Sequence, residues 1–188
     1  QKSLLDLLDE ILVQFRIDIG LPEKHLEDSK FLSIKDIATD SDEAFKSFSE
    51  GTYELYINSD VDAAITHYNK SIKIDSTSPQ VRYQLAICYV LKNESELAAK
   101  NWNAMIKHIY RLPERSTVSY KESYYRIYKK DLEKVRKILK MQVEMYPSYK
   151  LARLSLGNEY LSLNLNDEAL EQFLVAHQID PTDLQVLE

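Results

Sequence analysis

The chain has 188 residues, a formal net charge of −6, a hydrophobic content of 44% and a charged content of 29%. This is the composition of a globular protein of one domain, or of one domain with part of a second, and it excludes a disordered chain. No apolar run approaches the roughly 18 residues of a membrane span, so we expect no membrane insertion of this segment and favour a cytoplasmic location.

Residues 1–19 are predicted to form an amphipathic helix, because apolar side chains recur at helical spacing from Leu4 to Phe15. The chain begins without an initiator Met, so this helix is interpreted as the possible end of an upstream domain. Residues 20–40 are predicted to be a polar linker. At its end, Asp40 with Glu43 predicts a capping box that starts the next helix.

The rest of the chain contains a pattern that repeats about every 34 residues. Its clearest copy lies near the C-terminus and consists of Gly157, Tyr160, Ala169, Phe173, Ala176 and Pro181. Two upstream copies consist of Gly51, Leu55, Ala64, Tyr68 and Ser71, and of Ala86, Tyr89, Ala98, Trp102 and Met105. A degenerate copy between the second of these and the C-terminal copy has Val135, Leu139 and Pro147 in the matching phase.

This pattern resembles the tetratricopeptide repeat (TPR) family over residues 41–181. The resemblance implies an all-α fold, a right-handed α-solenoid of four helix hairpins at residues 41–77, 78–112, 113–147 and 148–181. Small residues let the two helices of a hairpin approach, large residues fill the remaining space, and Pro ends the second helix. Residues 182–188 are expected to begin a partial or capping helix.

The third hairpin departs most from the pattern, and its extra residues are expected around Arg111–Thr117, as a longer loop or an extended helix end. Its first helix, residues 119–130, contains four tyrosines and four basic residues. With a turn one residue shorter than usual, Tyr124 takes the close-packing position that Gly, Ala or Thr holds in the other copies. Its ring is expected to push the two helices apart or to tilt the hairpin. The residues predicted to be buried here are Tyr120, Ser123, Tyr124 and Ile127.

The concave groove is expected to be lined by the first helix of each hairpin. The candidate partner-binding residues are Tyr53, Tyr56, Tyr83, Gln84, Ile87, Lys121, Tyr125, Tyr128 and Asn158. Arg126 and Lys130 are assigned instead to a solvated face. A groove rich in aromatic and aliphatic side chains suits an extended or helical peptide. The clamp by which related domains hold a C-terminal carboxylate is not expected, because Ser49, Tyr53 and Gln84 replace its Lys and Asn residues.

No catalytic or cofactor-binding arrangement is found. Three glycines are too few for a phosphate-binding loop, and the four histidines lack the spacing of a zinc site. The lone Cys88 excludes an internal disulfide and is predicted to be a buried, inert thiol. We therefore expect no enzyme activity, no cofactor and no metal.

The sequence is compatible with three functions. The leading hypothesis is a non-catalytic module that binds a peptide or protein partner in the groove. The alternative is self-association into a homo-oligomer through the exposed helix of residues 1–19. The third is weak nucleic-acid binding through residues 107–140, which carry eleven Lys and Arg against four Asp and Glu in an otherwise acidic chain.

The order of segments is also similar to the C-terminal TPR region of bacterial signalling proteins, such as adenylate cyclases and kinase-linked proteins with a TolB-like domain upstream. The segments that carry this resemblance are KDIATDSDEAFKSFSEG, AITHYNKSIKID, and LPER before a tyrosine-rich helix. It implies a regulatory or scaffold role within a larger bacterial protein.

Overall fold

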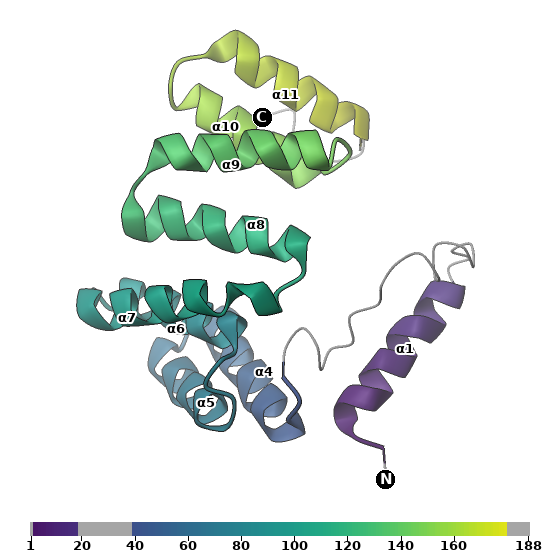
Figure 1. The fold of residues 1–188 in the computed structure, drawn as a ribbon, viewed down its shortest axis with the longest axis vertical. Helices are drawn as coiled ribbons and strands as arrows, with labels where there is room; N and C mark the ends of the chain where they lie inside the picture. Colours follow the sequence, from purple (N-terminus) through teal and green to yellow (C-terminus); the bar gives the residue numbers. More distant parts are fainter. Residues whose placement is uncertain (1, 19–38, 180–188) are drawn as a thin grey trace. The chain divides into compact units, whose positions relative to one another are not determined.

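The computed structural model describes residues 2–18 and 39–179, and all of its regular secondary structure in these ranges is helical (Figure 1). The chain divides into two compact units, Gln1–Thr117 and Val118–Glu188, which are treated separately below. Most of the predicted linker at 20–40 and the predicted capping helix at 182–188 lie outside the described residues.

The first unit contains α1 (Leu4–Asp18) and two helix hairpins. The hairpins are α4 (Asp42–Tyr56) with α5 (Val61–Ile74), and α6 (Pro79–Leu91) with α7 (Ser95–Lys107), followed by the short 3-10 helix η1 (Ile109–Arg111). The predicted capping box of Asp40 and Glu43 is wrong by one residue. Ser41 caps α4 instead, because its hydroxyl accepts a hydrogen bond from the backbone N–H of Ala44 at 3.2 Å.

The core of the first unit follows the repeat pattern. Tyr68 and Trp102, at the same position of successive copies, are fully buried, as are Ala64 and Met105. Gly51 brings α4 close to α5: a Cβ atom there would lie 2.8 Å from the ring of Tyr68. The small residue and the ring thus fit together as the repeat pattern predicts.

The second unit contains the end of α8 (Glu114–Ser123), the π-helix η2 (Tyr124–Lys129), α9 (Leu132–Met145), α10 (Lys150–Leu161) and α11 (Asn166–Ile179). Val135 and Leu139 of α9 form its core with Ala152 and Leu156 of α10. A Cβ atom at Gly157 would lie 2.4 Å from the ring of Phe173, which repeats the close approach seen at Gly51.

One turn recurs in all four hairpins. Ser59, Asn93, Lys130 and Asn164 have left-handed backbone conformations, with φ between 53° and 59°, and each lies two residues before a second helix begins. Their spacings are 34, 37 and 34 residues, so the third copy carries the insertion. The structure places the insertion before this turn, in η1 and in a longer first helix.

The third hairpin is the irregular one. Tyr124 is buried, as predicted, but Tyr120, Ser123 and Ile127 are only half-buried. The π-helix packs much less extensively against α9 than the helices of the other three hairpins pack against each other. This agrees with the prediction that Tyr124 loosens the hairpin. A π-helix is rare and is frequently found at functional sites.

The N-terminal helix α1 leaves most of its apolar face exposed. Leu5 is fully buried, whereas Ile11 and Phe15 are 63% and 58% exposed. The Asp42 carboxylate accepts hydrogen bonds from the backbone N–H groups of Leu4 and Leu5, at 2.8 and 3.3 Å, and so caps the start of this helix. None of the described helices is both long enough and apolar enough to span a membrane.

Candidate partner-binding surfaces

In the first unit, exposed tyrosines of α4 lie beside the face of α6 that the sequence assigned to the groove. Tyr53 and Tyr56 are 56% and 59% exposed, and the Tyr56 hydroxyl donates a hydrogen bond to Oε1 of Gln84 at 3.0 Å. Ile87, one turn further along α6, is half-buried. We call this surface the tyrosine strip: Tyr53, Tyr56, Gln84 and Ile87.

Tyr83 has a different environment from the strip. Its ring packs edge-on against Trp102, with ring centroids 5.5 Å apart and an interplanar angle of 84°. Because Trp102 is fully buried, much of the Tyr83 ring belongs to the packing between α6 and α7. A substitution at Tyr83 would therefore disturb the core as well as the surface.

In the second unit, the four candidate residues lie in three settings. Tyr125 packs against the core of Val135 and Leu139, with Lys134 Nζ 4.9 Å from its ring centroid. Tyr128 is half-buried, with Lys129 Nζ 4.4 Å from its ring centroid. Lys121 and Asn158 are exposed. The cation–π contacts place basic groups over rings, so Tyr125 and Tyr128 are not free stacking platforms.

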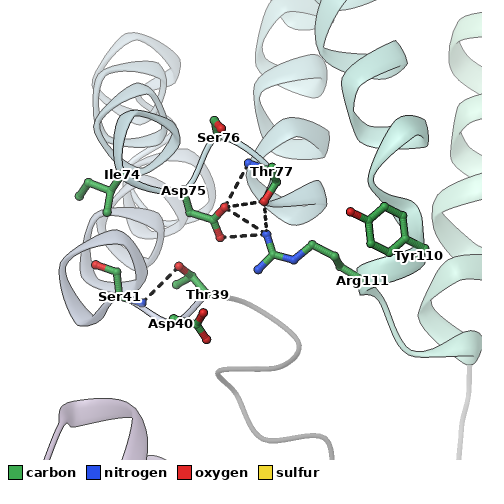
Figure 2. Close-up of a pocket in the computed structure, with 9 residues that line it drawn as sticks. All are labelled: Thr39, Asp40, Ser41, Ile74, Asp75, Ser76, Thr77, Tyr110 and Arg111. Atoms are coloured by element: carbon green, nitrogen blue, oxygen red, sulfur yellow. Dashed lines mark hydrogen bonds and ion pairs between the residues drawn. The ribbon is translucent and has the colours of Figure 1, made fainter.

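A polar hollow of about 630 Å³ lies where the first two hairpins meet (Figure 2). Nη1 of Arg111 donates to both carboxylate oxygens of Asp75 at 3.0 Å, and Thr77 donates to Oδ1 from its backbone N–H and its hydroxyl. Burial acts to raise the pKa of Asp75, but the hydrogen bonds from Thr77 and Arg111 outweigh it and hold that pKa below its ordinary value. The charges of Asp75 and Arg111 thus neutralise each other, and their hydrogen bonds hold the turn after α5 in place.

A second polar recess, in the second unit, was not predicted. It consists of an outer hollow of about 410 Å³ and an inner one of about 60 Å³, and both are lined by Glu122 and Ser155. Asn158 of α10 and Ser162, the C-cap of that helix, line the outer hollow, and Gln142 of α9 lines the inner one. We call the two hollows together the inter-helix recess.

Four charged side chains form a network beside this recess. Glu159, whose side chain is only 3% exposed, accepts a hydrogen bond from Nη1 of Arg126 at 2.9 Å and lies 3.6 Å from Nη1 of Arg136. Arg126 also donates to Glu122 from Nε. Burial acts to lower the pKa of Arg126, but its bonds to the two carboxylates outweigh this and raise it. The Arg126 side chain is 38% exposed, so it is partly solvated as predicted, but its pairing with two carboxylates was not predicted.

The sequence did hold a signal for this recess. Gln142 stands where the other copies have Ser71, Met105 and Ala176, and Glu159 stands two residues after the close-packing Gly157, as Cys88 does after Ala86. Both are nevertheless buried, at 3% exposure. Gln142 in particular is a long polar residue at a position that is small or apolar in the other copies, which marks a site where apolar packing has been replaced by polar contacts.

Cys88 is fully buried, and burial raises the pKa of its thiol to about 11, which agrees with the prediction of an inert thiol. Within residues 2–18 and 39–179, no group of three or more His, Cys, Asp or Glu side chains is arranged to hold a metal ion.

No family model and no curated protein sequence matches the chain. Several solved structures match in fold. MamA from Desulfovibrio magneticus RS-1, from its residue 41 onward, aligns over 78% of this chain and 80% of its own, with 16% identity and a TM-score of 0.56. YrrB, described as a TPR protein with an unusual peptide-binding site, aligns over 87% and 77%, with 18% identity and a TM-score of 0.52.

PilF from Pseudomonas aeruginosa aligns over 76% of this chain and 64% of its own, with 17% identity and a TM-score of 0.60. At these identities the similarity concerns the fold alone. The chain therefore has a TPR-like fold, an all-α solenoid of helix hairpins, as the repeat pattern predicts.

Proposed function

We propose that the chain is a non-catalytic interaction module that binds a peptide or protein partner through the tyrosine strip. The observation that carries this proposal is the pairing of Tyr53 and Tyr56, both more than half exposed, with a hydrogen bond that holds Tyr56 to Gln84. Exposed aromatic rings that are already held in place contribute much of the binding energy in protein interfaces. Lys121, Tyr125, Tyr128 and Asn158 remain proposed contacts in the second unit.

The strip favours a peptide with apolar side chains. No charged residue belongs to it, whereas Gln84 offers a polar group for orientation. Because the strip has no charged residue, it is not expected to recognise its ligand mainly through a carboxylate or phosphate group, which needs Arg or Lys donors. Tyr83, which packs on Trp102, is proposed to support the strip from below.

The experiment is a selection of random peptides displayed on phage against the full chain. Enriched peptides should bind the Tyr53→Ala/Tyr56→Ala double variant at least tenfold more weakly, since each buried ring contributes roughly 1–3 kcal/mol. Tyr110→Ala is the matched control, because Tyr110 is 75% exposed in the same unit but lies outside the strip. Equal affinity for wild type and double variant would overturn the proposal.

Self-association is the second candidate. It is supported by the exposed apolar face of α1, where Ile11, Leu12 and Phe15 are each more than 40% exposed. Light scattering of the full chain and of an Ile11→Glu/Phe15→Glu variant tests this candidate. Self-association through α1 predicts an oligomeric wild-type chain and a monomeric variant. A monomeric wild-type chain would exclude this candidate.

Nucleic-acid binding is the weakest candidate. Several basic residues of the third hairpin are paired within the chain: Arg126 with Glu122, Lys134 with Asp131 and Lys137 with Glu133. Such pairing lowers the number of cations available to phosphates.

We also propose that the module has a regulatory or scaffold role in a larger bacterial signalling protein. This part of the proposal rests only on the resemblance in the order of segments.

A further inference from the structure

The inter-helix recess of the second unit contains a polar atom that is buried without a partner. Nε2 of Gln142 donates no hydrogen bond among the described residues, whereas Oε1 of Glu159, which also accepts none, lies 3.6 Å from Nη1 of Arg136 in an ion pair. Gln142 is 97% buried. A buried polar group without a partner costs about 1–3 kcal/mol, so the unpartnered amide nitrogen of Gln142 calls for an explanation.

The recess has the right size for a small polar group at its inner end. The inner hollow measures about 60 Å³ and has Ser119, Glu122, Gln142 and Ser155 among its lining. A water molecule needs only about 10–15 Å³ of such space, so the inner hollow has room for a small polar group such as one primary amide. The neighbouring hollow of about 410 Å³ shares Glu122 and Ser155 with it.

The charges around the recess favour a neutral ligand. Glu122 and Glu159 are balanced by Arg126 and Arg136, with which they form ion pairs. A further unpaired charge would have to lose part of its hydration without gaining a counter-charge, which is costly. A neutral group that both accepts and donates hydrogen bonds avoids this cost.

We propose that the inter-helix recess binds the primary amide of a glutamine side chain in a partner peptide. The amide oxygen accepts a hydrogen bond from Nε2 of Gln142, and the amide nitrogen donates to Glu122, whose carboxylate keeps acceptor capacity beside its bond from Arg126. Leu139 and Ala152, which also line the inner hollow, contact the methylene groups of the side chain. Asparagine is one methylene shorter and reaches the inner hollow less well.

This site is separate from the tyrosine strip, because all of its residues belong to the second unit. A peptide that binds the strip is not required for the recess to accept an amide. The two proposals can therefore fail independently.

The test uses NMR titration of the full chain with blocked amino acids as probes. N-acetyl-glutamine N-methylamide should bind with a dissociation constant on the order of 1 mM, as expected for a ligand of about 14 heavy atoms, and should shift the signals of Ser155, Asn158 and the Gln142 side chain. The corresponding glutamate, lysine and leucine probes should bind at least tenfold more weakly.

The Gln142→Met variant should lose at least tenfold in affinity for the glutamine probe. Methionine occupies the equivalent position 105 in the second hairpin, where it is fully buried, so the variant is expected to fold. Gln14→Met, at an exposed position of α1 outside both proposed surfaces, is the matched control and should keep full affinity for the probe.

Two results would overturn the proposal. One is equal binding of all four probes, or no binding of any up to about 20 mM, which would identify the recess as a hydrated structural cavity. The other is unchanged affinity in a folded Gln142→Met chain. If that variant does not fold, the ranking of the four probes on the wild-type chain decides.

Discussion

Replacing Gly51 with alanine tests the close packing on which the hairpin fold depends. The added Cβ atom would lie 2.8 Å from two ring carbons of Tyr68 and 3.2 Å from the carbonyl oxygen of Ala64. Carbon atoms in contact prefer separations of about 3.5–4.0 Å. The ring cannot retreat easily, because it is fully buried, packs at 5.9 Å from the Phe48 ring and is hydrogen-bonded to Thr52.

The expected cost follows from two opposing effects. Overpacking of a well-filled core costs about 1–3 kcal/mol, whereas Gly→Ala in a helix gains about 0.5–1 kcal/mol. Taking the middle of each range, the net loss in the free energy of unfolding should be about 1.3 kcal/mol. With a urea dependence of about 2 kcal/mol per molar, the unfolding midpoint should fall by roughly 0.6 M.

Fluorescence of Trp102 is the right assay for this change. It is the only tryptophan of the chain and is fully buried in the first unit, which also contains Gly51, so its signal reports unfolding of that unit. Ser49→Ala, at an exposed position of the same helix, is the control and should leave the midpoint within a few tenths of a molar. An unchanged or higher midpoint for Gly51→Ala would refute the packing argument.

The remaining predictions concern titratable groups. The Cys88 thiol, with its pKa raised to about 11 by burial, should react with a disulfide reagent at pH 8 only after unfolding; rapid reaction of the native chain would contradict its burial. Burial also raises the pKa of Tyr68 to about 12, so near pH 10 both groups are neutral in the folded chain, whereas the unfolded chain releases protons. The free energy of unfolding, and with it the urea midpoint, should therefore fall as the pH rises from about 9 to about 12. The loss should reach up to about 2.7 kcal/mol per group, and a flat profile would exclude this. Arg111→Met should lower stability by about 1–3 kcal/mol, because it removes the donor to both Asp75 oxygens. The pKa of Asp75 is lowered in the folded state, so its ionised form stabilises the fold above its ordinary pKa, and this stabilisation is lost as the pH falls. The Arg111→Met variant should therefore lose less stability than wild type between pH 6 and 3. An equal loss would contradict this assignment.

The regular part of the fold could be predicted because it depends on residue size at fixed positions. Gly51 and Tyr68, or Gly157 and Phe173, fit together as pairs, and such pairs are visible in a single sequence. The exposed tyrosines of α4 followed from the same phase. Burial of a tyrosine at position 124 and the looseness of its hairpin were also predicted, because a large ring cannot occupy a close-packing position without moving a helix.

The π-helix and the inter-helix recess could not be predicted in this way. The repeat pattern assigns each residue to a position within the repeat, but it does not predict how the backbone changes when a residue is too large for its position. Here the chain widens into a π-helix between Tyr124 and Lys129 before the turn at Lys130. Arg126, assigned to solvent from the regular phase, also contacts Glu122 and Glu159.

The charge network at Glu159 explains why the irregular hairpin is also the polar one. A buried ion pair contributes little net stability compared with apolar packing of the same volume, but breaking it by removing one partner costs about 3–5 kcal/mol. The second unit therefore gains little in stability from Arg126 and Arg136 over apolar residues, yet it cannot lose either easily. What the polar residues provide is a recess with a free donor, Nε2 of Gln142, beside the α10 helix. An apolar core would have closed that space, so the departure from the repeat pattern and the proposed binding of a polar group have the same physical origin.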